Sequence, residues 1–511
     1  MIHSRHDPVV RINRGIALVL AASTAAVLAF GGGQARAQTP WVDPVPRANC
    51  GSGDRVEPGL QGQTSLADRL SGASKTPYNC NLDFVGNFTG EGAEWQMAWY
   101  QDCAYYDTRN NTQQVNRGTV VVDVSNPTNP VASAYLNDPS MAEPWESLKV
   151  HDRRQLLAAA QANSGGGTQP GFAMYDVSQD CKHPKLLFAG NIDVTPGGVR
   201  GHAGQFSKDG NTYWGAVIGG AIYPLDVTDP SNPRLLAKFL PVAGVAAPHD
   251  VSTNDDGTRL YIANLGSSGT VQKNGLVIAD VSDVQNRLPN PQMRIVSEMY
   301  WPDGRVTQQP TPIRIKGRPY ILQADENSPR MAGCAQGLSP FGMARIIDIL
   351  DERNPKLVSK LMLEANAPSN CVAAFSDFIS TGGFLYDAHY CTVDDPKNAK
   401  MAACSYMQAG VRIFDIRNPY LPKEVAYYKV GAVGTAFRPG STIWNATNPS
   451  RAHDLSSSNI RFLRKDGQVY IWFTSHDNGF TVAKLSDHLR DIEPGLFTPG
   501  TPGSTGNTQP Y

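Results

Sequence analysis

The sequence predicts an all-β fold, a seven-bladed β-propeller whose ring is closed by an N-terminal strand. Two observations carry this prediction. A short phrase, an apolar run that ends in Asp before a turn rich in Asn, Asp and Pro, recurs along the chain. A further apolar run precedes most copies, so that a unit contains several strands. Long repeats with several strands per unit are typical of propeller blades.

The phrase is clearest at residues 118–130, which read Gly-Thr-Val-Val-Val-Asp and then Val-Ser-Asn-Pro-Thr-Asn-Pro. An apolar run rich in Val and Ile that stops at Asn-Pro is typical of a buried strand followed by a tight turn. The residue that ends each apolar run, usually Asp, occupies the same position in every copy and can be used to align the copies. By subtraction of sequence numbers these positions lie 50–69 residues apart, at Asp123, Asp176, Asp226, Asp280, Asp348, Asp415 and Lys484. Seven copies predict seven blades, with the phrase as the third strand of each.

The other strands of each unit stand on either side of the phrase. Second strands are expected after Gly-containing hairpin turns, at residues 212–217, 259–264, 318–323 and 468–473. Residues 81–87 resemble the outer strand at 186–191, yet they precede the first copy of the phrase. No comparable strand follows the seventh copy. We therefore expect the N-terminal strand to complete blade seven, which leaves no sheet edge exposed.

The two ends of the chain are predicted to lie outside the propeller. Residues 1–37 have the positive start, the apolar run and the small-x-small site of a signal peptide. No later run is long enough to span a membrane. Composition then divides the rest into a linker at 38–60, the propeller at 61–493 and a disordered tail at 494–511. The expected location is periplasmic or secreted.

Charge and cysteine content limit the partners and the chemistry. Lys and Arg number 45 against 46 Asp and Glu, which argues against nucleic acid or an anionic membrane as a partner. All eight Cys follow the predicted cleavage site, and an even number in an exported chain favours disulfides. Spacing suggests Cys391–Cys404 and Cys50–Cys80, although the connectivity stays open. The absence of a CxxC pair argues against a Cys-based zinc or redox site.

The phrase resembles the LVIVD repeat of exported bacterial proteins. The copies at 118–127 and 275–283 are the most similar, and the likeness extends over residues 80–490. The resemblance implies a propeller architecture. It implies no particular activity, because unrelated functions share the same folds.

Four His are predicted to share one structural position, the start of the first strand of a blade, and three are followed by Asp. These residues are His151, His202, His249 and His453, with Asp152, Asp250 and Asp454. First strands line the centre of a propeller, so these side chains are expected to converge near the axis. Converging neutral imidazoles can bind a transition metal such as iron, copper or zinc, and a neighbouring Asp can orient the ring.

This placement is similar to the axial His sets of carotenoid-cleavage oxygenases and of methanethiol oxidase and selenium-binding proteins. Four further residues could line a pocket for a small-molecule ligand on one face: Glu94, Glu326, His389 and His476. The sequence thus predicts an exported metal-dependent oxidoreductase or lyase that acts on a small organic compound. The alternative is a non-catalytic binding or scaffold propeller of the cell envelope, in which the His-Asp pairs are structural.

Overall fold

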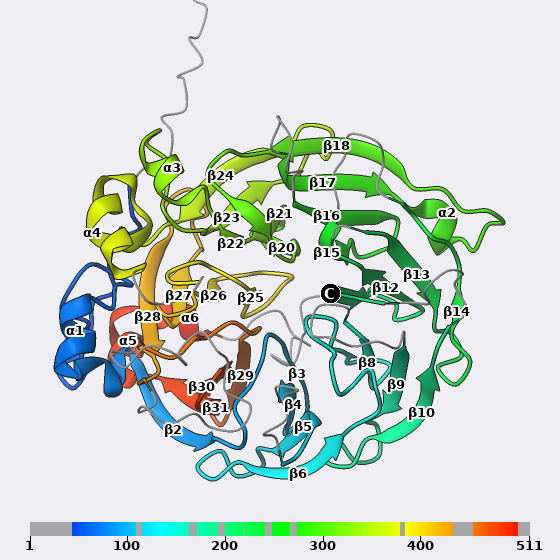
Figure 1. Ribbon diagram of the computed structural model, residues 1–511, viewed down its shortest axis with the longest axis horizontal. Coiled ribbons are helices and arrows are strands. Elements are labelled where there is room, and N and C mark those ends of the chain that lie inside the picture. The colour runs from blue at the N-terminus through cyan, green and yellow to red at the C-terminus, as the bar shows by residue number, and fades with distance from the viewer. Residues whose placement is uncertain are drawn as a thin grey trace, which may run out of the picture. The chain divides into compact units, whose positions relative to one another are not determined.

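Seven antiparallel sheets stand around a ring in the unit Trp41–Tyr511 (Figure 1). The computed structural model describes residues 43–108, 115–162, 171–192, 200–218, 220–240, 248–265, 273–378, 384–432 and 453–498. The predicted signal peptide, and the predicted tail from residue 499 onward, lie outside the described residues. The seven-bladed β-propeller that the sequence predicts is confirmed.

The first three blades are four-stranded sheets in simple sequence order. Blade one contains β3 (Met97–Tyr100), β4 (Cys103–Thr108), β5 (Gly118–Asp123) and β6 (Val131–Leu136). Blade two contains β7 (Lys149–His151), β8 (Leu156–Ala160), β9 (Phe172–Asp176) and β10 (Lys185–Gly190). Blade three contains β11 (Ala203–Phe206), β12 (Thr212–Ala216), β13 (Ile222–Asp226) and β14 (Arg234–Leu235).

The later blades carry the longer insertions. Blade four contains β15 (Pro248–Thr253), β16 (Arg259–Leu265), β17 (Asn274–Asp280) and β18 (Arg294–Tyr300). Blade five contains β20 (Thr311–Ile315), β21 (Arg318–Gln323), β23 (Ala344–Asp348) and β24 (Lys356–Leu361), beside the small sheet of β19 (Arg305–Thr307) and β22 (Asp325–Asn327). Blade six contains β25 (Cys391–Val393), β26 (Met401–Ser405), β27 (Val411–Asp415) and β28 (Lys423–Lys429). Blade seven contains β29 (Arg461–Lys465), β30 (Gln468–Ser475) and β31 (Gly479–Leu485).

The N-terminal strand β2 (Leu82–Phe88) completes blade seven, as the sequence predicts. It pairs with β31 from Leu82 opposite Leu485 to Phe88 opposite Phe480. Lys484 replaces the Asp of the phrase in this blade, and it lies opposite Asp83, with 3.9 Å between Nζ and Oδ2. The preceding strand β1 (Tyr78–Cys80) adds a fifth strand to blade six by pairing with β28.

The repeated phrase forms the third strand of every blade, and its Asp has a structural role. The carboxylate of the Asp accepts a hydrogen bond from the backbone N–H two residues later in six blades. In blade one, for example, Oδ1 of Asp123 accepts from the N–H of Ser125 at 2.9 Å. Such Asx turns stop a strand and begin a tight turn. The apolar residues of the phrase pack in the core clusters together with residues of the neighbouring strands.

Short helices lie outside the blades. They are α1 (Leu66–Ser71), α2 (Ser282–Gln285), α3 (Arg330–Cys334), α4 (Cys371–Phe375), α5 (Asp487–Ile492) and α6 (Pro494–Phe497). In the described part of the chain, no helix has the length and apolar character that crossing a membrane requires.

The predicted boundaries at residues 60 and 493 do not mark the limits of packed structure. Within the predicted linker, the N–H of Val45 donates to the carbonyl oxygen of Met362 at 2.8 Å, and Glu57 is buried. Beyond residue 493, Leu496 of α6 is buried in the core of blades six and seven. Composition rich in Pro and Gly predicts a flexible chain, but these segments are ordered by specific contacts with the blades.

All eight Cys form disulfides, which fits an extracellular protein. The predicted pairs Cys391–Cys404 and Cys50–Cys80 are both present. The sequence left the other pairs open, and they are Cys103–Cys181 and Cys334–Cys371. The first of these joins blades one and two, while the second joins α3 to α4.

Candidate functional site

Side chains from five blades meet near the axis, at the start of the inner strands. His202 precedes β11, His389 precedes β25, and Gln308 precedes β20. Each is placed by the same contact: the N–H of His202 donates to the carbonyl oxygen of Ala216 at 2.7 Å, and that of His389 to Ser405 at 2.8 Å. Gln308 makes the equivalent bond to the strand beside it, at 2.8 Å. These backbone bonds fix the same register in blades three, five and six.

The first group of ligand atoms joins Glu146, His202 and His249, from blades two, three and four. The Nε2 atoms of the two rings lie 2.8 Å apart. Oε2 of Glu146 lies 3.3 Å from Nε2 of His202 and 3.7 Å from Nε2 of His249. All three residues are buried. One carboxylate oxygen and two imidazole nitrogens at these separations are a set that could hold a metal ion.

The second group joins Glu146, Glu326 and His389, so that Glu146 belongs to both groups. Nε2 of His389 lies 3.1 Å from Oε1 of Glu146 and 2.9 Å from Oε2 of Glu326. Nε2 of Gln308 lies 3.0 Å from Oε2 of Glu326 and 3.0 Å from Nε2 of His389. We call the six residues Glu146, His202, His249, Gln308, Glu326 and His389 the axial cluster.

Backbone carbonyls determine which nitrogen carries the proton in two of the rings. Nδ1 of His249 lies 2.9 Å from the carbonyl oxygen of Thr307, and Nδ1 of His389 lies 2.7 Å from that of Ser457. A carbonyl oxygen only accepts, so Nδ1 donates in both rings. In the neutral form of each ring the lone pair is therefore on Nε2, which faces the carboxylates. Metal-binding His side chains are commonly oriented in this way.

The protonation of the cluster follows from burial and from the contacts among its members. Burial lowers the pKa of His249, which favours the neutral ring that a metal requires. Burial also acts against the charged form of His389, but its hydrogen bonds to the carboxylates of Glu146 and Glu326 outweigh it and raise the pKa to about 10. Burial disfavours the Glu146 carboxylate, yet its contacts with the surrounding His side chains hold its pKa well below the usual value.

Tyr390 links the cluster to a second buried carboxyl group. Its hydroxyl oxygen lies 3.1 Å from Oε2 of Glu146 and 3.2 Å from Oδ2 of Asp250. A phenol has one proton and can donate to only one of the two carboxylates. Burial raises the pKa of Asp250 to about 6, so Asp250 is the carboxyl group that more readily carries a proton and donates it to the phenol oxygen. The three residues can therefore pass a proton to or from the cluster.

Trp95 and Trp145 lie against rings of the axial cluster, and Phe384 packs on Trp95; we call these three side chains the aromatic cover. The ring of Trp95 lies 5.4 Å from that of His389, and the ring of Trp145 lies 6.0 Å from that of His202. Trp95 also contacts Trp145 and Phe384, at 5.5 and 5.7 Å. Trp145 has a φ of 49°, which is strained for a residue with a side chain. The cover places apolar surface beside the polar cluster.

His151 does not belong to the cluster, so the predicted convergence is wrong for this residue. It ends β7 instead of opening it, and it lies at the hairpin end of blade two. Its Nε2 is 3.2 Å from the carbonyl oxygen of Lys208, and its Nδ1 accepts a hydrogen bond from the N–H of Arg154 at 3.1 Å. Burial lowers its pKa to about 4. Its contacts are those of a structural side chain.

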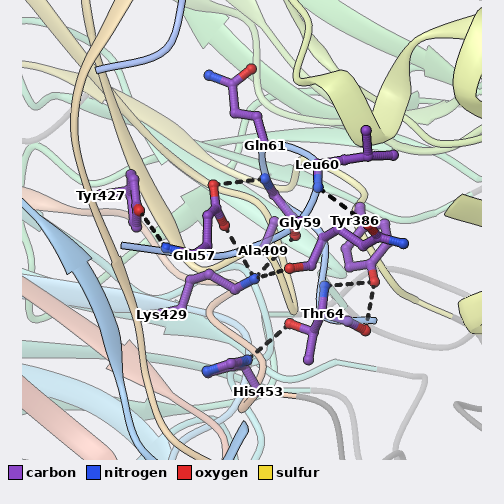
Figure 2. A network of polar contacts seen from close by, with 12 residues as sticks. Glu57, Gly59, Leu60, Gln61, Thr64, Tyr386, Ala409, Tyr427, Lys429 and His453 are labelled. Carbon is purple, nitrogen blue, oxygen red and sulfur yellow. Dashed lines mark hydrogen bonds and ion pairs between the residues drawn. The ribbon is translucent and has the colours of Figure 1, made fainter. Parts of the chain in front are cut away.

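His453 is also separate from the cluster, and Figure 2 shows its contact with Thr64. Its Nδ1 lies 2.9 Å from Oγ1 of Thr64, and its Nε2 lies 3.3 Å from the carbonyl oxygen of Thr76. The ring also contacts that of Tyr78, at 5.0 Å. The residue thus holds the N-terminal segment against blade seven. Of the four predicted His ligands, the structure brings together His202 and His249.

The Asp residues predicted to orient the His rings do not do so. Thr307, and not Asp250, accepts the hydrogen bond from His249. Oδ2 of Asp454 accepts from the N–H groups of Asp477 and Asn478, each at 2.9 Å. Asp152 lies in the hairpin turn that follows β7.

The four predicted ligand-binding residues divide into two pairs. His389 and Glu326 belong to the axial cluster. His476 lies beside the aromatic cover: its ring is 5.0 Å from that of Trp95, and its Nε2 is 2.9 Å from Oγ of Ser457. The carbonyl oxygen of Glu94 accepts from the same Ser457 hydroxyl, at 3.2 Å. The carboxylate of Glu94 is in neither ligand group of the described residues.

Sequence reasoning missed Glu146, Gln308 and Tyr390. A parallel bridge between Glu146 and Ala203 shows that Glu146 occupies in blade two the position next to that of His202 in blade three. A hollow of about 660 Å³ lies elsewhere, lined by charged residues of blades four and five such as Arg259 and Glu352, and no member of the cluster lines it.

The fold and the cluster define a class: a seven-bladed β-propeller with a buried set of carboxylates and imidazoles where blades two to six meet. The chain carries LVIVD repeats, since the model of that repeat matches residues 114–137 and 270–286. Among solved structures, the chain is similar to the C-terminal WD40 domain of Sif2. The identity is 9%, the alignment covers 79% of this chain and 98% of that chain, and the TM-score is 0.44. No curated protein matches the chain.

Proposed function

We propose that the protein is exported and binds a transition-metal ion, such as iron, copper or zinc, through Glu146, His202 and His249. With this ion it acts as a metal-dependent oxidoreductase or lyase on a small organic compound. The binding site for the ion is the first ligand group of the axial cluster.

The observation that carries this proposal is the spacing of the three ligand atoms. They lie 2.8, 3.3 and 3.7 Å from one another. Ligands about 2.1 Å from one ion and roughly 90–120° apart are separated by about 3.0–3.6 Å. The three atoms therefore need only small shifts to bind one ion. The lone pair that the Thr307 contact leaves on Nε2 of His249 supports the same conclusion.

The surroundings indicate what the site could do. Three protein ligands leave a coordination position for water or substrate, as in catalytic metal sites. The aromatic cover offers apolar contacts to the carbon atoms of a small substrate beside that position. Tyr390 and Asp250 provide a path for a proton, since the phenol contacts both Asp250 and the carboxylate of Glu146.

The scaffold function has specific support of its own. The hydrogen-bonding atoms of His151 and His453 are partnered by neighbouring segments, as blade-locking side chains would be. If His202 and His249 were also structural side chains that lock neighbouring blades together, they would bind no metal. The two functions therefore differ in one measurable property, the metal content.

The test is the metal content of the purified mature protein after expression in metal-supplemented periplasm. We expect about one equivalent or more of a transition metal, and loss of one equivalent from the double variant His202→Ala, His249→Ala with little change in circular dichroism. The matched control is His151→Ala, which removes a buried His outside the cluster and should retain the metal. A wild-type protein without stoichiometric metal, or equal loss in the control, would contradict the proposal.

A further inference from the structure

We propose that the axial cluster holds two metal ions, and that Glu146 bridges them with its two carboxylate oxygens. The second ion is bound by Glu146, Glu326 and His389. This inference rests on the proposed function, since the first ion is the one described above. The experiment below distinguishes the absence of the second ion from the absence of the first ion, on which the proposed function depends.

The division of the Glu146 oxygens is the first argument. Oε2 lies nearest to the ring nitrogens of His202 and His249, whereas Oε1 lies 3.1 Å from Nε2 of His389. Each oxygen thus faces a different set of ligands. A carboxylate in this position binds one ion through each oxygen, and ions joined in this way lie about 3.5–4 Å apart in two-metal sites.

The second argument concerns the atoms around His389. When His389 is neutral, the atoms that face one another beside it are three acceptors, and the amide nitrogen of Gln308 contacts them at 3.0–3.4 Å. Because Nδ1 donates to Ser457, the neutral ring has a lone pair on Nε2. This lone pair meets Oε1 of Glu146 at 3.1 Å and Oε2 of Glu326 at 2.9 Å, and both carboxylate oxygens are acceptors. Three acceptors that face one another require a cation or a proton between them. Three ligands of this kind, one nitrogen and two oxygens, suit a divalent first-row metal ion.

The third argument comes from Gln308, whose side chain is fully buried beside these atoms. Its Oε1 atom has no hydrogen-bond partner among the described residues, while its Nε2 lies 3.0 Å from Nε2 of His389. The two ends of a Gln amide are assigned only from their hydrogen bonds. Rotation of the amide by 180° directs Oε1 at Glu326 and His389. This oxygen then serves as a fourth ligand of the second ion, and the amide no longer has an unpartnered acceptor there.

The fourth argument concerns charge. Among the described residues, no Lys or Arg forms an ion pair with Glu146 or Glu326. The nearest buried lysine, Lys149, instead donates to the carbonyl oxygen of Glu146 at 3.1 Å. A buried carboxylate, Glu146, beside the partly buried Glu326, without a permanently charged partner, is costly unless a cation joins the two. Two divalent ions supply that charge, and they leave positions at which an oxygen of water or substrate can bind both ions.

The experiment measures bound Mn²⁺ in the full-length mature protein by equilibrium dialysis, after removal of other metals. We expect two ions in the wild type, one in His389→Ala, one in His202→Ala, and none or weak binding in Glu146→Gln. The conservative variant Glu326→Gln should also bind one ion, which keeps the test valid if His389→Ala fails to fold. The control His183→Ala removes an exposed His and should bind two ions.

Electron paramagnetic resonance of the Mn²⁺-loaded protein provides the second measurement. The wild type should give the signal of an exchange-coupled pair, and His389→Ala the six-line signal of an isolated ion. A wild type with one ion that His389→Ala retains would overturn the second site and leave the proposed function intact. One ion that is lost from both His389→Ala and His202→Ala would also overturn it, in favour of a single shared site. No bound ion in the wild type would contradict both proposals.

Discussion

Two buried charged regions of the propeller differ in the source of their positive charge. One is the axial cluster. The other, which we call the Arg412 network, joins the N-terminal segment to blade six through Glu57, Arg412, Glu424 and Lys429 (Figure 2 shows Glu57 and Lys429). In this network the guanidinium of Arg412 lies 2.8 Å from Glu57 and 2.9 Å from Glu424. The protein itself supplies two cations for two carboxylates.

The axial cluster has the same number of carboxylates, but among the described residues their ion-pair partners are imidazoles. Burial acts against the Glu57 carboxylate, but Arg412 and Lys429 lower its pKa to about 2. Glu146 and Glu326 depend instead on protons that the His rings bind and release. The Arg412 network, whose charges are neutralised within the protein, can serve packing alone. The axial cluster, in which acceptors face one another, is suited to an added cation. The predictions below test this difference.

The largest expected effect is on stability, in the Arg412 network. Arg412→Met removes the cation that Glu57 and Glu424 share, and two buried carboxylates then lose their main partner. We expect a loss of about 3–5 kcal/mol in the free energy of unfolding, measured by urea denaturation. Metal content should not change. Glu146→Gln should show the opposite result, with loss of metal and, in the metal-free state, a change of less than about 1 kcal/mol.

A similar loss of stability in metal-free Arg412→Met and metal-free Glu146→Gln would contradict the difference between the two regions. The axial cluster would then be a structural network like that of Arg412.

A smaller effect is expected from chelation. An ion at 100 times its dissociation constant stabilises the folded state by about 2.7 kcal/mol. A chelator should therefore lower the melting temperature of the wild type and, to a similar extent, that of Arg412→Met. It should not affect Glu146→Gln, in which both ligand groups are disrupted. Differential scanning calorimetry with and without chelator makes the measurement, and equal shifts in all three proteins would place the bound metal outside the axial cluster.

The smallest effect is a dependence on pH in the Arg412 network. Burial lowers the pKa of Lys429 from 10.5 to about 8 in the folded protein. Between these values the unfolded chain binds more protons, so the free energy of unfolding rises as the pH increases from 8 to 10.5, and below pH 8 the contribution is constant. This rise is at most roughly 3 kcal/mol. Lys429→Met should abolish it in urea denaturation measured across this range, whereas an unchanged slope would mean that other groups cause it.

The blade count, the third strands and the ring closure could be predicted because each rests on a local pattern. The strand that ends at Asp123 recurs with its own Asx turn, and the strand at 81–87 lacks a partner in sequence order. The two predicted disulfides have short sequence separations, of 13 and 30 residues. The pair Cys103–Cys181, separated by 78 residues, depends on how two blades pack and left no signal in the sequence.

The candidate site could be predicted in part. The wrong assignment of His453 to the same position as His202 and His249 has a geometric cause. His202 and His249 each stand eight residues before a hairpin glycine, Gly210 and Gly257, whose φ angles are positive. His453 stands fourteen residues before Gly467, too far for the same position. His249 and His453 are each followed by Asp, which suggested that the two His occupy the same position in their blades. Their different distances from the hairpin glycine contradict this.

A spacing one residue longer leads to two of the residues that the sequence analysis missed. Gln308 stands nine residues before Gly317. In blade two no hairpin glycine marks the register, and Gln155, with a φ of 55°, takes that place nine residues after Glu146. Counting back from the hairpin glycine reaches Gln308 to within one residue, but it reaches Glu146 only once the backbone is known.

The pairing of β2 with β31 also determines when the ring of blades can close during synthesis of the chain. The strand β2 ends at Phe88 and its partner begins at Gly479, about 390 residues later. At about 5–20 residues per second, a ribosome needs roughly 20–80 s to synthesise the intervening chain. During that interval β2 has no partner, and six blades can assemble before the seventh exists. The last event of synthesis is therefore the one that converts an open row of blades into a ring.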